Sequence, residues 1–361
     1  MKKDIQDKFS KWPFFNEKGF LTVAGPCSAE TYEQVMTTAE QIHQLGIKVF
    51  RAGVWKPRTR PGSFEGVGKE ALDWMLEAKR KYGLKTTVEV ANRQHVLDAL
   101  EKEVDILWIG ARTTVNPFTI QEIADTLQGI DIPVLIKNPV NPDVDLWLGA
   151  VERLEKAGVT RVGAIHRGVS QFNKSLYRNK PEWEMAIEFR KQRPDLLLIC
   201  DPSHISGNRD LVPLIAQTAL DLMFDGLMIE THLSPDNAWS DARQQITPMQ
   251  LKLLLDELVV PVEFAEGIEL SGFEDLRNVI NDIDNQLIQL LSERMTIVND
   301  IAHFKKAHNL AIFQEKRWNQ LVAQHLENGK SKGLSTQFIQ KIFNAIHAES
   351  IDKQGQVFYK K

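Results

Sequence analysis

Residues 20–51 read FLTVAGPCSAETYEQVMTTAEQIHQLGIKVFR and decide the fold of the first part of the chain. Two short apolar runs, at 20–24 and 47–51, enclose a segment of helical length at 30–45. A strand, a helix and a second strand in this order predict a parallel β–α–β unit, because parallel strands need a long crossover between them. We therefore expect a parallel sheet to begin here.

The same order recurs along the first 260 residues. The predicted strands are 20–24, 47–51, 85–90, 106–109, 133–137, 161–165, 196–200 and 227–230. Segments of helical length include 30–45, 68–82, 118–127, 144–156 and 181–192. Eight such units favour a (β/α)8 barrel, the TIM barrel of the α/β class. A doubly wound open sheet is the alternative, but the Gly-rich turn that binds dinucleotides follows none of these strands.

The sequence changes character beyond Pro261. From Phe273 to Lys361 there is no proline, and apolar residues recur every three, four or seven positions over 273–306. This period predicts a helix about 50 Å long, which suggests an oligomeric bundle. Two shorter helices are predicted at 314–328 and 335–353, with Ser335 as a cap and 328–333 as the turn before it. We expect a barrel at 1–260, a linker at 261–272 and an all-α three-helix domain at 273–361.

The composition excludes several classes of protein. Across 361 residues, 44 Lys and Arg stand against 48 Asp and Glu, whereas a general nucleic-acid binder carries a basic excess. No apolar run approaches the roughly 18 residues of a membrane span, and we identify no signal peptide and no room for a regulatory domain before the first strand. Two cysteines do not make a disulfide framework. We expect a cytoplasmic protein with reduced thiols.

Basic side chains gather where the predicted strands end. The loops after the strands of a barrel meet at one mouth and carry the chemistry. Six cations stand there: Arg51, Lys56, Arg58, Arg112, Lys137 and Arg167. Any one of them alone is as well explained as a solvated loop charge, but six like charges are costly together unless anions neutralise them. We therefore expect a small substrate with several phosphate or carboxylate groups.

A second group combines one thiol, one imidazole and two carboxylates after the first, seventh and eighth strands: Cys27, His204, Glu230 and Asp241. Such a mixed donor set suits a divalent transition metal, and the first and eighth strands are neighbours in a closed barrel. Taken singly, Cys27 is more often a buried core residue, and His204 is more often a loop or core histidine. Cys200 lies inside an apolar strand and is assigned to the core. His232 is either a support of this site or structural, and Glu89 is either catalytic or paired with a lysine.

Six segments of the barrel resemble the synthase family that makes 3-deoxy-D-arabino-heptulosonate 7-phosphate (DAHP), in its short barrel type. They are AGPCS (24–28), RAGVWKPRT (51–59), GAR (110–112), IKNP (136–139), HRG (166–168) and DPSH (201–204), and the resemblance covers about residues 15–260. KPRT is the most specific of them. The related synthase that uses arabinose 5-phosphate has a KANRS-like segment there and is the closest alternative. Relatives often carry CERG where this chain has IHRG, at 165–168.

This resemblance implies condensation of phosphoenolpyruvate with erythrose 4-phosphate and release of phosphate. It implies that Arg51, Lys56, Arg112, Lys137 and Arg167 hold phosphoenolpyruvate. Arg58 and Thr59 would hold the aldose phosphate, Asp201 a sugar hydroxyl, and Lys56 is the candidate proton donor. One divalent metal per barrel on Cys27, His204, Glu230 and Asp241 would act as Lewis acid on the aldehyde. Manganese is our first choice, and iron, cobalt and zinc also accept these ligands.

The helical tail resembles an all-helical chorismate mutase over about residues 273–354. The motif elements are LRNVINDID (276–284), SER (292–294), Lys305, Arg317 and Ser350 with Gln354. The resemblance implies that chorismate rearranges to prephenate by confinement and charge stabilisation, without covalent catalysis. Arg277, Arg294 and Arg317 would bind its carboxylates. Lys305 and Gln354 would hydrogen-bond the ether oxygen that breaks.

The spacing of the tail's basic residues bears on assembly. Arg294 and Lys305 are about three turns apart and share a helix face, whereas Arg277 is roughly 25 Å from Arg294 along the axis. One small ligand cannot touch Arg277 and Arg294 of one straight helix, so we expect an antiparallel homodimer to join them. Where the family commonly places acids near the ring hydroxyl, this chain has Gln314 and Trp318. Trp318 favours the alternative of a chorismate or prephenate sensor and dimerisation module that inhibits the barrel.

Overall fold

The structure, a computed structural model, describes residues 11–14, 16–57, 62–172, 175–261 and 271–359. The chain divides into two compact units, residues 1–264 and 265–361, and each is described by itself. Most of the predicted linker at 261–272 lies outside the described residues. None of the helices in the described part of the chain is long and apolar enough to cross a membrane.

The first unit is a closed barrel of eight parallel strands in sequential order, as predicted. Strands β1 and β8 close it, with Leu21 opposite Gly226 and Gly25 opposite Glu230. The second strand begins at Val49, two residues later than the sequence predicts. The strands are β1 (Leu21–Gly25), β2 (Val49–Arg51), β3 (Lys85–Val90), β4 (Ile106–Ile109), β5 (Val134–Lys137), β6 (Val162–His166), β7 (Leu197–Cys200) and β8 (Gly226–Glu230).

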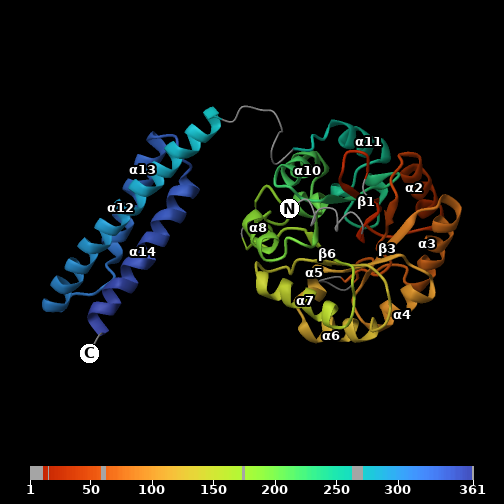
Figure 1. Ribbon diagram of the computed structural model, residues 1–361, viewed down its shortest axis with the longest axis horizontal. Coiled ribbons are helices and arrows are strands. Elements are labelled where there is room, and N and C mark those ends of the chain that lie inside the picture. The colour runs from red at the N-terminus through yellow and green to blue at the C-terminus, as the bar shows by residue number, and fades with distance from the viewer. Residues whose placement is uncertain (1–10, 15, 58–61, 173–174, 262–270, 360–361) are drawn as a thin grey trace. The chain divides into compact units, whose positions relative to one another are not determined.

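Helices form a ring around the strands (Figure 1). Side-chain caps start several of them: Thr31 accepts from the backbone N–H of Gln34 at 3.1 Å, and Asn92 from that of His95 at 2.9 Å. The helices are α2 (Tyr32–Gln44), α3 (Lys69–Tyr82), α4 (Arg93–Glu101), α5 (Ala111–Thr114), α6 (Pro117–Thr126), α7 (Val144–Lys156), α8 (Trp183–Gln192), α9 (Pro202–Ser206), α10 (Val212–Asp221) and α11 (Pro248–Glu257).

The core has two layers, because alternate residues of a strand point into and out of the barrel. One buried cluster fills the interior and includes Leu21, Val23, Ile106 and Trp108. The other lies between strands and helices and includes Cys200, as predicted for that thiol. The barrel is therefore packed through its centre, and its chemistry is confined to its rim.

Trp12 closes one end of the barrel. It is buried and belongs to the interior cluster with Leu21, Ile106 and Leu197, the first residues of their strands. A methyl group at Gly163 would lie 3.2 Å from its ring. The segment before β1 thus seals the amino-terminal end and leaves the opposite end for the site.

The second unit consists of three helices: α12 (Ser271–Ala307), α13 (Glu315–Ser331) and α14 (Thr336–Tyr359). The long first helix is confirmed. Ser335 caps α14 as predicted, accepting from the backbone N–H of Phe338 at 3.2 Å. The turn predicted at 328–333 is wrong in part, because α13 continues to Ser331. The first half of α12 exposes apolar side chains: Leu276, Val279, Ile280, Ile283, Leu287 and Leu290.

Replacing Trp12 with alanine should destabilise the barrel. The substitution removes a large side chain from a close-packed interior, so we expect the free energy of unfolding to fall by about 3–5 kcal/mol. Urea unfolding followed by near-ultraviolet circular dichroism measures the change. Phe118→Ala is the control, since that side chain is 88% exposed and its loss should change stability by less than about 0.5 kcal/mol. An equal effect of both substitutions would contradict the role of Trp12.

Candidate active site

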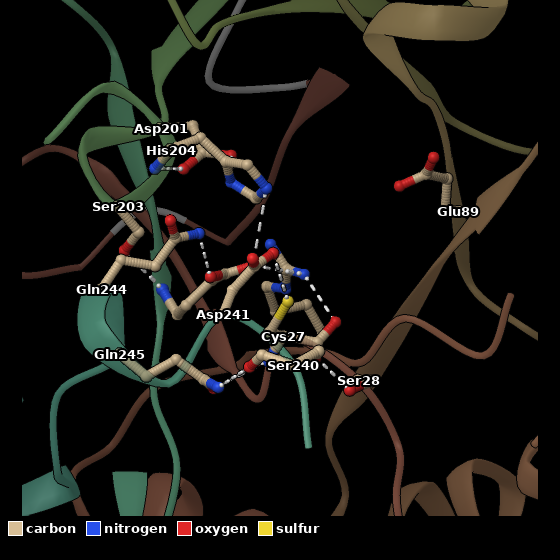
Figure 2. Close-up of polar contacts among 12 residues, drawn as sticks. Cys27, Ser28, Glu89, Asp201, Ser203, His204, Ser240, Asp241, Gln244 and Gln245 are labelled. Carbon is tan, nitrogen blue, oxygen red and sulfur yellow. Dashed lines mark hydrogen bonds and ion pairs between the residues drawn. The ribbon is translucent and has the colours of Figure 1, made fainter. Parts of the chain in front are cut away.

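Three of the four predicted metal ligands, Cys27, His204 and Asp241, lie close together in Figure 2, and the fourth, Glu230, ends β8. The pairing of β1 with β8 sets Gly25 opposite Glu230, and Cys27 follows two residues later. Cys27, Glu230 and Asp241 each present one ligand atom, and these atoms lie within 4.8 Å of one another. Nε2 of His204 lies 3.7 Å from Oε1 of Glu230. Three loops distant in the sequence thus bring these side chains into one group.

The chemistry of this group fits a divalent transition metal. It combines sulfur, imidazole nitrogen and carboxylate oxygen, the donors that such ions accept. Oε1 of Glu230 is buried and receives no hydrogen bond from any described residue. The Arg51 guanidinium lies 3.3 Å from this oxygen and balances its charge in part, while its lone pairs stay open to a further cation. Asp201 lies 2.8 Å from Nδ1 of His204, which turns Nε2 toward Glu230.

Burial and charge set the protonation of these ligands. Burial raises the pKa of the Cys27 thiol to about 12, and the Glu230 carboxylate adds to the shift. Lys56 opposes it, with Nζ 3.0 Å from Sγ. Burial alone would raise the pKa of Asp241, but Arg178, His204 and Lys56 together outweigh burial and lower it. A metal ion at this group would therefore displace the thiol proton and meet a carboxylate that is already ionised.

Two of the predicted cations are already balanced by acids of the chain. Arg51 Nη2 lies 3.3 Å from Glu230, and Lys137 Nζ lies 2.8 Å from Asp201. Both cations also lie over the ring of Trp108, at 4.8 and 5.9 Å from its centroid. The expectation that the cations depend on bound anions for balance therefore holds only in part.

The remaining cations differ in what they contact. Arg167 donates to Oδ1 of Asn179 at 2.8 Å, and Arg112 donates to the carbonyl of Pro57 at 3.2 Å. Burial lowers the pKa of Arg167 to about 10, so its guanidinium keeps its charge at neutral pH. A half-buried guanidinium held by an amide suits an anionic ligand. The predicted residues Arg58 and Thr59 lie outside the described part of the chain.

Two residues that hold the carboxylate ligands were not predicted. Gln244 Nε2 donates to Oε2 of Glu230 at 2.6 Å. Arg178 Nη1 lies 3.0 Å from Oδ1 of Asp241 and donates to Oε1 of Gln244 at 2.6 Å. Both come from loops after β8 and β6, and the strand pattern does not predict the path of those loops. No signal in the sequence would have found them.

A second set of contacts ties the loop after β8 to the loop after β1. Gln245 Oε1 accepts from the backbone N–H of Cys27 at 2.9 Å. Glu30 Oε1 accepts from the backbone N–H of Trp239 at 2.8 Å, and His232 Nε2 lies 3.4 Å from the other oxygen of Glu30. His232 therefore contacts the loop after β1 through Glu30, and both alternatives for it, a support of this site or a structural residue, stay predictions.

Glu89 lies apart from the Cys27 group (Figure 2). Its Oε2 accepts from the indole N–H of Trp108 at 3.0 Å. Among the described residues its partner is thus an indole and not the lysine that the sequence offered as an alternative. It borders a cavity of about 180 Å³ lined by Trp55, Lys56, Pro57, Glu65, Glu89, Ala91 and His95.

Four predicted residues of the helical unit contact one another in two hydrogen-bonded pairs. Arg294 Nη1 donates to Oγ of Ser350 at 2.7 Å, and Lys305 Nζ donates to Oε1 of Gln354 at 3.1 Å. Arg277 is on the same continuous helix as Arg294, but it is exposed and pairs with Glu274 at 2.8 Å. Arg317 is exposed on the first turn of α13. The structure therefore brings together Arg294, Lys305, Ser350 and Gln354, without Arg277.

The chain matches known families in both units. Residues 15–260 match the DAHP synthetase I family, which is more than half of the chain. The chain belongs to the DAHP synthetase I family. In this member, residues 276–355 match chorismate mutase type II. The protein therefore combines a family of transferases with a family of isomerases, and both take part in the shikimate pathway.

Several relatives of this DAHP synthetase I member resemble its barrel. A phospho-2-dehydro-3-deoxyheptonate aldolase of Thermotoga maritima is 34% identical over 239 residues, covering 66% of this chain and 69% of the relative. The crystal structure of the Thermotoga maritima DAHP synthase has a TM-score of 0.61 at 32% identity, covering 67% of this chain and 69% of that one. A 2-dehydro-3-deoxyphosphooctonate aldolase of Dechloromonas aromatica is 25% identical, covering 72% of this chain and 96% of the relative.

His166 stands where the family resemblance leads us to expect an acid. Its imidazole is fully buried against aromatic rings on the outer layer of the barrel, with Trp183 at 5.5 Å and Phe224 at 6.1 Å between centroids. Its Nε2 contacts the carbonyl of Pro181. The residue thus belongs to the aromatic packing outside the strands.

Burial lowers the pKa of His166 to about 4, against about 6.5 in an unfolded chain. Between these values the unfolded state binds a proton that the folded state does not, so stability falls as the pH falls. From pH 7 to pH 4 we expect wild type to lose about 3 kcal/mol more than His166→Phe. Urea unfolding of both proteins at several pH values in this range measures it. Parallel pH curves for the two proteins would contradict the assignment.

Proposed function

We propose that the barrel condenses phosphoenolpyruvate with erythrose 4-phosphate to DAHP and phosphate. The observation that carries this proposal is the group of Cys27, His204, Glu230 and Asp241 beside two buried cations, Arg51 and Lys137, and two half-buried ones, Lys56 and Arg167. Such a set of cations suits a small substrate with a phosphate and a carboxylate. The likeness to a phospho-2-dehydro-3-deoxyheptonate aldolase supports this choice of substrates over arabinose 5-phosphate.

In this proposal the cations hold the substrates in line for the reaction. Arg112, Lys137 and Arg167, with Arg51 and Lys56, bind the phosphate and carboxylate of phosphoenolpyruvate. Arg58 and Thr59 bind the phosphate of the aldose, and Asp201 binds one of its hydroxyl groups. The enol carbon attacks the aldehyde carbon, water adds to the cationic carbon left behind, and phosphate leaves. Lys56 would donate the proton to the new alkoxide.

Cys27, His204, Glu230 and Asp241 would hold one divalent metal, with Mn2+ as the first choice and Fe2+, Co2+ or Zn2+ accepted by the same donors. When bound, it polarises the aldehyde oxygen of the aldose. Gln244 and Arg178 keep the two carboxylates oriented toward the group. Lys56 beside Cys27 stabilises the thiolate that such an ion requires.

The two cysteines provide a matched test of this metal site. Cys27→Ala should lower bound Mn2+ from about one per chain to near zero and slow phosphate release by at least about a hundredfold, because it removes a ligand. Cys200→Ala removes an equally buried thiol from the outer core. It should retain both the bound Mn2+ and the rate of phosphate release. Equilibrium dialysis with metal analysis and an assay of phosphate release measure the outcomes. Full metal binding by Cys27→Ala would contradict the site.

We propose that the helical domain converts chorismate to prephenate. Arg294 and Lys305 lie on one face of α12 and are held by Ser350 and Gln354 of α14. Burial lowers the pKa of Lys305, which indicates a partly enclosed ammonium. Two fixed cations suit a dicarboxylate, and confinement with charge stabilisation is sufficient for a pericyclic rearrangement. Arg317 would join them when a ligand is bound.

The domain is proposed to act as a homodimer. Arg277 and Arg294 are seventeen residues apart on one helix, about 25 Å along its axis, so no small ligand reaches both in one chain. The first half of α12 exposes a row of apolar residues that a second copy would cover. An antiparallel pair would supply Arg277 of one protomer to the Arg294 group of its partner.

Complementation between two inactive variants tests both proposals. Arg277→Ala and Arg294→Ala should each abolish turnover, followed as loss of chorismate absorbance. In a mixed dimer one of the two sites is intact, so co-expression should restore about a quarter of wild-type turnover. No recovery would contradict the shared site. Chorismate binding by wild type without turnover would favour a sensor domain that inhibits the barrel.

A further inference from the structure

The helical domain contains a histidine that the proposed chorismate site does not yet use. His347 lies on α14 three residues before Ser350 and seven before Gln354, so these residues share one face of the helix. Ser350 contacts Arg294, and Gln354 contacts Lys305. His347 therefore extends by one turn the row of α14 side chains that faces the cations.

Aromatic neighbours fix the orientation of the imidazole. Its ring stacks on that of Trp318 from α13, with centroids 3.8 Å apart and planes at 15°. The ring of Phe313 approaches at 5.9 Å with planes at 58°. A ring held by two others has little rotational freedom, so its nitrogens point in fixed directions.

Nε2 of His347 is buried and has no hydrogen-bond partner among the described residues. The other polar side chains of the row are occupied. Ser350 Oγ accepts from Arg294 and donates to a backbone carbonyl one turn earlier. Gln354 accepts from Lys305 and donates to the carbonyl of Ser350 at 3.1 Å. A buried ring nitrogen without a partner is unfavourable unless a ligand supplies one.

Charge decides which ligand group suits this nitrogen. Burial lowers the pKa of His347 below its ordinary value, and Arg294 and Lys305 of α12 lower it further. Trp318 and Phe313, which pack against the ring, carry no charge. The imidazole is therefore neutral at pH 7 and stands beside two cations. Carboxylates pair with the cations, whereas a hydroxyl group can donate to or accept from a neutral imidazole.

We propose that Nε2 of His347 hydrogen-bonds the ring hydroxyl of chorismate and that Trp318 positions the imidazole. This inference rests on the proposed function of the helical domain. Arg294 and its neighbours bind the two carboxylates, and His347 distinguishes a hydroxylated ring from one without the hydroxyl. The aromatic residue at 318 then contributes to hydroxyl recognition through its neighbour.

The test deletes the hydroxyl from the ligand and the nitrogen from the protein. Full-length wild type and His347→Phe are compared on chorismate and on its analogue without the ring hydroxyl, by kcat/KM and by calorimetric binding. Wild type should prefer chorismate by about tenfold, the contribution of one hydrogen bond. His347→Phe keeps a stacked ring, so it should lose this preference while its values for the analogue match those of wild type.

Two further variants keep the result interpretable. His347→Gln is neutral and hydrogen-bonding, and it should retain part of the preference even if His347→Phe folds poorly. His308→Phe removes another stacked imidazole, which lies on Phe304 at 4.2 Å, and should leave the preference unchanged. An equal loss on both ligands in His347→Phe, or a preference kept in full, would overturn the inference. If wild type binds and converts neither ligand, while Arg294→Ala behaves identically, the proposed function itself fails.

Discussion

The pairing of β1 with β8 is the constraint on which the barrel site depends. This pair sets Gly25 opposite Glu230, so a thiol two residues after one strand meets the carboxylate that ends the other. Gly25 has φ of +144°, and a methyl group there would lie 2.1 Å from the carbonyl oxygen of Arg51. Only glycine fits this approach of β1 to β2. The pairing of β1 with β8 that closes the barrel therefore also places Cys27 beside Glu230.

Charge is the second constraint on the mouth. The site keeps its cations in place before substrate arrives by pairing two of them with its own acids, Arg51 with Glu230 and Lys137 with Asp201. These acids also touch His204, so cation pairing and ligand orientation share the same oxygens. A bound anion would compete for Lys137 and Arg51, and the acids would then turn more fully to the metal side. In the proposed reaction, substrate and metal binding would therefore favour each other.

Much of the barrel site was predictable from the sequence, because its residues stand at the ends of strands. Cys27, Glu230 and the cation Lys137 stand where apolar runs stop, and a closed barrel brings such positions to one mouth. The supports Arg178 and Gln244 were not predictable, because they sit in irregular loops whose path depends on tertiary packing. The sequence shows an unexpected histidine at His166, but it does not show which way the side chain points. A shift of one residue along a strand turns a side chain from the mouth to the outer layer.

In the helical domain, too, the sequence predicts positions along one element but not the packing between elements. Helical periodicity predicts that Arg294 and Lys305 share a face, and it separates Arg277 from them, because both facts depend on one helix alone. The stacking of His347 on Trp318 depends on how α13 and α14 pack, which no period encodes. A tryptophan read alone offers only an indole N–H. Stacked on His347, Trp318 orients the imidazole, so the two residues recognise the ligand together.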